Sequence, residues 1–244
     1  MIAQNKFMGY PLNAYFSLHG SETEQNYIRG LFDQFESAKT MGAYHLALFA
    51  YHLLFMCFLY ETLYKIKLWF PVEHNMAFVS FSAQQRKKFR DAKNSTDYVG
   101  EHNRERSLFE FLNIFCDCET LVSKCKSLVD YRNKNLGHAN YELADENIFE
   151  NKITEYDQTA SEIHGLTHNQ LAKVFDEYVA KLAPDEKITK DDLELNLIDL
   201  NNLSDADLGC LAAECEIKSG QNTYGKIKSI LQNDFGVDIC LETK

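Results

Sequence analysis

The stretch Ala43–Tyr60 reads AYHLALFAYHLLFMCFLY and holds no Asp, Glu, Lys or Arg. Its length is marginal for a membrane span, which needs about 20 apolar residues. His45 and His52 recur seven residues apart on one helical stripe, and such polar groups are costly in a bilayer. We therefore expect a central helix that its neighbours bury on nearly all sides, with membrane insertion as the minor alternative. The two histidines are expected to be core residues with satisfied hydrogen bonds rather than ligands.

Segments with apolar residues three or four apart lie on both sides of this stretch, and none alternates as a strand does. The pattern predicts helices over residues 21–39, 41–70, 104–136, 145–182, 203–216 and 224–233. Ser21 and Glu24 form a capping box at the start of the first helix, and Pro71 ends the second. We expect a looser polar connection over residues 72–103 and a break at Gly165.

The composition points to a globular, all-α protein. The chain has 244 residues, 45% of them hydrophobic, with only 3 Pro and 11 Gly, which excludes disordered and collagen-like chains. We expect an up-and-down helical bundle over residues 1–183 and a small, mainly helical, acidic module over residues 184–244. The 7 cysteines are scattered, and the sequence does not open on a signal-peptide pattern. Reduced thiols and a cytoplasmic location are therefore expected.

The charge is unevenly distributed along the chain. The formal net charge of −11 argues against a nucleic-acid partner, because phosphate-binding surfaces are normally basic. Residues 1–138, however, have a net charge of +2, and residues 139–244 have −13. The first part includes a basic cluster with Phe81 and Phe89 interleaved. This cluster is a solvated helix face or a phosphate-contacting edge, and it consists of Arg86, Lys87, Lys88, Arg90 and Lys93.

The segment Asp130–Tyr141 reads DYRNKNLGHANY and carries the residues best suited to chemistry. Arg132 falls on the apolar stripe of its predicted helix, where an arginine is costly unless it is paired or lies in a cleft. Local rules broken in this way tend to mark functional sites. In the alternative, purely structural interpretation, Arg132 pairs with Asp130 or a distant carboxylate, and His138 only caps the helix end.

The Arg132–Asn133 pair followed by His138, at the end of a long helix in a helical chain, resembles the HEPN superfamily and its R-x4–6-H motif. The resemblance covers residues 21–183 or so and implies a HEPN-like bundle with metal-independent endoribonuclease activity, as in toxin–antitoxin, phage-defence and CRISPR systems. It also implies a homodimer in which both copies of Arg132 and His138 form one composite site. A catalytically inactive HEPN scaffold subunit is the alternative, and it would hold Arg132 in an internal salt bridge.

The residue types suit RNA cleavage by attack of the 2′-hydroxyl. Histidine exchanges protons near neutral pH, which fits His138 as acid or base. Arg132 offers a permanently charged fork that matches phosphate oxygens, and Asn133 would orient the His138 ring or the scissile phosphate. The RNA-contacting residues are expected to be Arg86, Lys87, Lys88, Arg90 and Lys134.

Regulation, partners and cofactors follow mainly from the resemblance. In HEPN toxins neutralised by a nucleotidyltransferase, a tyrosine two residues after the histidine is modified, whereas Tyr141 lies three residues after His138. Tyr141 is therefore a candidate regulatory residue with a displaced spacing. The expected partners are RNA, a second copy of the chain and an antitoxin or defence-complex protein, with no membrane. No cofactor or metal is expected, because Cys116, Cys118 and Cys125 lack a metal-binding spacing.

Overall fold

The structure is a computed structural model that describes residues 10–99, 105–115, 118–136, 145–182, 187–218 and 222–237. The described residues form helices and turns without a strand, so the prediction of an all-α protein is confirmed for them. Contacts divide the chain into two compact units. Unit 1 comprises residues 1–13 and 21–166, and unit 2 comprises residues 14–20 and 167–244. The domain boundary predicted after residue 183 stays a prediction.

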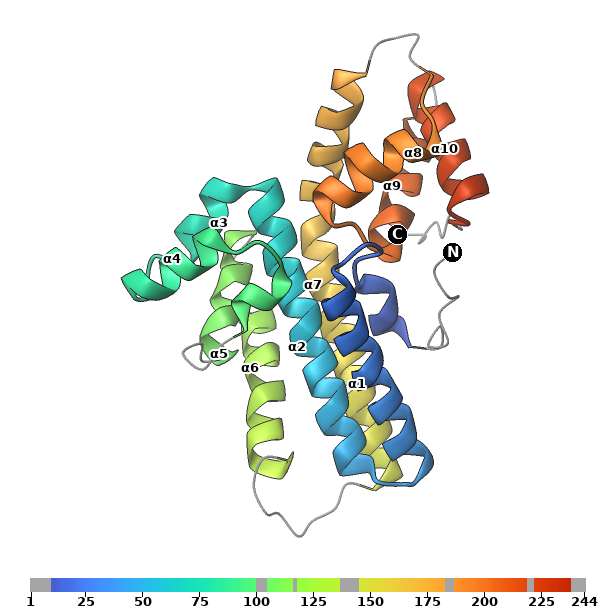
Figure 1. The fold of residues 1–244 in the computed structure, drawn as a ribbon. Helices are drawn as coiled ribbons and strands as arrows, with labels where there is room; N and C mark the ends of the chain where they lie inside the picture. Colours follow the sequence, from blue (N-terminus) through green and yellow to red (C-terminus); the bar gives the residue numbers. More distant parts are fainter. Residues whose placement is uncertain are drawn as a thin grey trace. The chain divides into compact units, whose positions relative to one another are not determined.

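Unit 1 is built around α2, which runs beside α1 and the first part of α7 (Figure 1). Its helices are η1 (Pro11–Tyr15, up to residue 13), α1 (Glu22–Thr40), α2 (Tyr44–Trp69), α3 (Pro71–Ala77), α4 (Ala83–Asp91), η2 (Ser95–Tyr98), α5 (Glu105–Leu108), η3 (Phe109–Ile114), α6 (Glu119–Tyr131), η4 (Arg132–Leu136) and α7 (Glu146–Lys181, up to residue 166). The segments η1, η2 and η3 are 3₁₀-helices, whereas η4 is a π-helix.

The helix α2 is buried along most of its length, as the charge-free stretch predicts. Among the described residues it is the one helix long and apolar enough to cross a membrane, with a mean hydropathy of 1.6, yet 72% of that window is buried inside the structure. Aromatic rings of α1 and α7 pack on it: Phe35 and Tyr156 both contact Tyr51. Buried aromatic area of this kind dominates the packing of a helical core.

Three expectations about helix boundaries are wrong. The connection over residues 72–103 contains α3, α4 and η2, because capping boxes start the last two: Ser82 with Gln85, and Asn94 with Asp97. The helix predicted over residues 104–136 is interrupted, since the short α5 continues as 3₁₀-helix η3 and α6 begins only at Glu119. Gly165 does not break α7, because one glycine costs a helix interior only about 0.5–1 kcal/mol.

Most of the cysteines in the described part of the chain are not in disulfide bonds. Cys57, Cys125 and Cys215 are free thiols, whereas Cys118 is disulfide-bonded. The expectation of reduced thiols is therefore wrong for Cys118.

Unit 2 joins residues 14–20 to the C-terminal helices. These helices are the remainder of α7, α8 (Lys190–Leu193), the π-helix η5 (Glu194–Asp199), α9 (Asp205–Ile217) and α10 (Asn222–Asp234). Ser17 and Ser204 form an isolated antiparallel bridge, and the Leu18 amide donates to the Leu203 carbonyl at 3.0 Å. The helices predicted over residues 203–216 and 224–233 are confirmed, whereas α8 and η5 lie outside the predicted helices.

The capping box of α1 also ties that helix to η2. One carboxylate oxygen of Glu24 accepts from the Ser21 amide at 3.0 Å, and the other accepts from the Ser95 amide at 3.1 Å. The Glu24 side chain is buried, whereas Glu22 in the same turn is exposed.

Replacing Glu24 with alanine is expected to lower the free energy of unfolding by about 2–3 kcal/mol, because the buried Ser95 amide and hydroxyl lose a charged acceptor. Urea denaturation would measure the change, and Glu22→Ala, which should stay within about 0.5 kcal/mol of the wild type, is the matched control. Equal losses in the two variants would contradict this role for Glu24.

Candidate functional site

Arg132 lies where α6 gives way to the π-helix η4. Its backbone amide still donates to the carbonyls of Leu128 and Val129, and its side chain turns inward, with 20% of its surface exposed. Nη2 of Arg132 donates to Oε2 of Glu105, at the start of α5. Single π turns inside helices often occur at functional sites. The prediction that a stripe arginine needs a partner or a cleft is therefore met by an ion pair.

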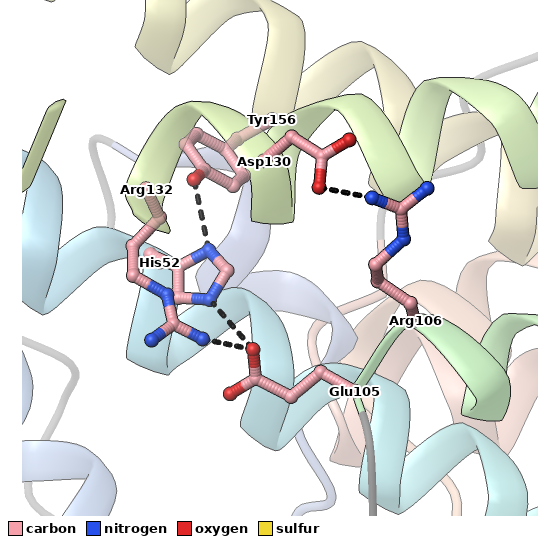
Figure 2. A network of polar contacts seen from close by, with 6 residues as sticks. All are labelled: His52, Glu105, Arg106, Asp130, Arg132 and Tyr156. Atoms are coloured by element: carbon pink, nitrogen blue, oxygen red, sulfur yellow. Dashed lines mark hydrogen bonds and ion pairs between the residues drawn. The ribbon is translucent and has the colours of Figure 1, made fainter. Parts of the chain in front are cut away.

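The same oxygen of Glu105 also faces a buried histidine (Figure 2). His52 of α2 has no exposed side-chain surface, and its Nε2 lies 3.8 Å from Oε2 of Glu105, which is longer than a hydrogen bond. On the other side of the ring, Nδ1 lies 2.9 Å from the hydroxyl oxygen of Tyr156, on α7. Four helical segments of unit 1 thus bring Tyr156, His52, Glu105 and Arg132 into one chain of polar contacts.

The protonation states in this chain follow from burial and charge. Burial lowers the pKa of His52 most strongly; Glu105 opposes it and raises the pKa, and the weaker effect of the Arg132 charge lowers it again, so that the pKa is lowered overall. His52 is therefore neutral at neutral pH. We assign its proton to Nε2, because a nitrogen lone pair directed at an ionised carboxylate would be repelled. Nδ1 then accepts a hydrogen bond from the Tyr156 hydroxyl.

Glu105 is the anion of the network. Burial by itself raises its pKa, but the contacts with His52 and Arg132 outweigh burial and lower the pKa overall. Glu105 therefore stays ionised well below neutral pH and faces a permanently charged guanidinium. The second acidic group in Figure 2, Asp130, pairs with Arg106 instead. Of the two structural partners considered for Arg132, the distant carboxylate is present.

The other residues of the predicted site lie apart from this network or outside the described residues. Asn133 and Lys134 are exposed on η4, so the π turn places them on the solvent side while Arg132 turns inward. His138 and Tyr141 lie outside the described residues. The pairing of Arg132 with His138 and the regulatory role of Tyr141 therefore stay predictions.

The basic cluster lies at the other end of α2 from Arg132. Its members on α4 are exposed, but Phe89 is buried and points into the core. Arg86 donates a hydrogen bond to the Val79 carbonyl at 3.1 Å, so one of its donors is already used within the fold. Because α2 ends at Trp69 and α3 and α4 follow from Pro71 onward, α4 is displaced from the network around His52. At 1.5 Å per residue, about 25 Å of α2 separates His52 from Trp69.

Sequence reasoning missed Glu105, Tyr156 and the part played by His52. The expectation that His52 is a satisfied core residue holds for Nδ1 only, since Nε2 is buried without a hydrogen-bond partner in the described part of the chain. The position of His52 on the most apolar helix could have indicated a polar network, because both nitrogens of a buried imidazole need hydrogen-bond partners. Among the described residues, no group of three His, Cys, Asp or Glu is arranged to hold a metal ion.

Comparisons with known proteins add no family. The chain matches no protein-family model, no curated protein and no solved structure. The resemblance to HEPN proteins therefore rests on the Arg132 motif and the helical context.

Proposed function

We propose that this protein is a metal-independent endoribonuclease of HEPN type that acts as a toxin or an anti-phage defence effector. The observation that carries the proposal is the state of Arg132: its guanidinium is held by Glu105 through Nη2 alone. In the described part of the chain, Nη1 has no hydrogen-bond partner, whereas Nε is unpartnered but buried, so the donors left for a ligand are on the terminal nitrogens. A fixed arginine with donors to spare, six residues before a histidine, is suited to bind a phosphate.

The proposed reaction breaks the bond from phosphorus to the 5′-oxygen. His138 takes the proton of the attacking 2′-hydroxyl or gives one to the leaving 5′-oxygen, and its counterpart in a second copy does the other. Arg132 stabilises the charge that develops on the phosphorane. Asn133, exposed next to Arg132, orients the His138 ring or the phosphate.

The partners of this site are proposals of the same kind. RNA is the substrate, and the active form is a homodimer located in the cytoplasm. An antitoxin or a defence-complex protein would control it, with the acidic residues 184–244 or Tyr141 as the regulatory contact. RNA would lie along Arg86, Lys87, Lys88, Arg90 and Lys134.

A single incubation tests the activity. Purified full-length protein is mixed with total RNA, with and without EDTA, beside the His138→Ala variant. We expect cleavage that resists EDTA and leaves a 2′,3′-cyclic phosphate and a 5′-hydroxyl. Cleavage that needs a metal ion, or that His138→Ala retains, would contradict the mechanism.

Lowering the positive charge of α4 should weaken RNA binding without changing the chemistry. Lys87→Ala and Arg90→Ala are each expected to reduce the slope of log K against log salt by about 0.7, the value for one contact to a single-stranded phosphate. Filter binding of a 2′-deoxy oligonucleotide across salt concentrations measures this slope. Lys173→Ala, which removes an exposed charge from α7, is the control, and an equal change there would refute an RNA surface on α4.

The Arg132–Glu105 ion pair also favours a second candidate, the catalytically inactive scaffold subunit. In that case the pair is purely structural, and the wild type cleaves no RNA. Arg132→Ala would then act only on stability, since Glu105 would be left without its cation.

A further inference from the structure

Glu105 contacts only one edge of the Arg132 guanidinium. The ion pair uses one carboxylate oxygen, Oε2, and one nitrogen, Nη2. Arginine binds a carboxylate most tightly through two parallel hydrogen bonds, which occupy two of its nitrogens. In Figure 2 the other terminal nitrogen of Arg132 points away from Glu105. The pair therefore fixes the side chain and leaves donors for an anion.

We infer that Glu105 is a positioning residue for the proposed nuclease and holds Arg132 in place to receive the scissile phosphate. His52 and Tyr156, on the side of Glu105 away from the phosphate, would help to fix the position of Glu105. The inference rests on the proposed function for its effect on cleavage. It adds a role for three residues outside the R-x4–6-H motif. None of the three would touch the reacting atoms.

The two residues that would fix Glu105, His52 and Tyr156, are held in the core because both are buried. His52 is completely buried on α2, and Tyr156 on α7 is almost completely buried. A long arginine side chain otherwise samples many rotamers, and ordering it on substrate binding costs up to about 2 kcal/mol. Because Glu105 is ionised and anchored before RNA arrives, this ordering takes place during folding.

The alternative is that Glu105 occupies the place of the phosphate and inhibits the site. An inhibitory carboxylate would need to block the donors that bind phosphate, whereas here Nη1 lacks a partner among the described residues. The two ideas predict opposite signs for the loss of Glu105. The geometry therefore favours positioning, and the sign of the effect can overturn it.

Kinetics of three variants of the full-length chain test the inference. Glu105→Ala is expected to lower kcat on a short RNA by about 10–100-fold, the effect of misplacing a catalytic group by about 1 Å, with KM changed less than threefold or so. Glu105→Gln, which keeps an acceptor for Nη2, should recover part of kcat. Asp130→Asn removes a carboxylate from the neighbouring exposed ion pair with Arg106 and should match the wild type.

A second measurement separates this inference from the proposed function. Side-chain ¹⁵N spectra of arginine-labelled protein, with the Arg132 signal assigned from Arg132→Lys, report whether the guanidinium rotates freely. We expect restricted rotation in the wild type and in Asp130→Asn, and free rotation in Glu105→Ala. If the wild type cleaves no RNA, the proposed function fails, and these spectra still decide whether Glu105 orders Arg132.

Three results would overturn the positioning role. The first is an unchanged or higher kcat in Glu105→Ala, and the second is an equal loss in Asp130→Asn. The third is an Arg132 signal that is equally mobile with and without the Glu105 carboxylate. Thermal unfolding of each variant confirms that the compared proteins are folded under the assay conditions.

Discussion

Replacing Arg132 with alanine is expected to lower RNA cleavage by about 10²–10³-fold, the usual effect of removing one donor that stabilises transition-state charge. Replacing His138 with alanine should lower it by about 10²–10⁴-fold, because a positioned acid or base contributes that much. Both effects should appear in kcat more than in KM. Single-turnover cleavage of a labelled oligonucleotide measures them.

The nature of the substitution at Arg132 sharpens this prediction. Arg132→Lys keeps the charge but loses the planar fork, so it should recover only part of the rate. Arg106→Ala removes an arginine from the adjacent ion pair with Asp130 and should retain the wild-type rate. If Arg132→Ala and His138→Ala both cleave RNA at the wild-type rate, the proposed mechanism is wrong. If the wild type itself cleaves no RNA, the scaffold interpretation replaces the nuclease.

Acidification is expected to destabilise unit 1 through His74 by at most about 3 kcal/mol. His74 on α3 is buried, and its Nε2 lies 2.8 Å from the Tyr98 hydroxyl oxygen. Burial, followed by the charge of Lys67, lowers the pKa of His74 to about 4. In the unfolded chain, His74 has the ordinary histidine pKa of about 6.5. The stabilisation is therefore complete above that pH and is lost as the pH falls toward about 4.

Urea denaturation at about pH 7 and about pH 4.5 measures this loss. His74→Gln keeps an acceptor for the Tyr98 hydroxyl but does not titrate, so its stability should fall less than that of the wild type over the same interval. His45→Gln, on the half-buried N-terminal turn of α2, serves as the control and should follow the wild type. Parallel losses in His74→Gln and the wild type would assign the pH dependence to other groups.

Local signals in the sequence predicted the parts of the fold that local interactions determine. Ser21 and Glu24 form the expected capping box, and the charge-free stretch became the buried α2. The connection over residues 72–103 was misjudged because its polar helices lack an apolar stripe, although Ser82 and Gln85 carried the same capping signal as Ser21 and Glu24. Apolar periodicity alone could not distinguish the 3₁₀-helix η3 from an α-helix, since residues three apart share a face in both.

The candidate site was predictable only in part for a related reason. Arg132 was conspicuous because a charge on an apolar stripe breaks a local pattern. Its partner, Glu105, is one of many acidic residues in the chain, and no local pattern distinguishes it. The pairing depends on how α5, α2 and α6 pack, and a single sequence does not contain that information.

The π turn at η4 changes how the number of residues after Arg132 relates to the distance that they span along the helix axis. A π-helix bonds each residue to the fifth one along, where an α-helix uses the fourth. The segment Arg132–Leu136 therefore holds an additional residue without a longer path along the axis. A chain with one residue fewer would reach the same end point through an α turn. In the proposed R-x4–6-H motif, which tolerates four to six intervening residues, such a turn would absorb an insertion while the helix before it stays in register.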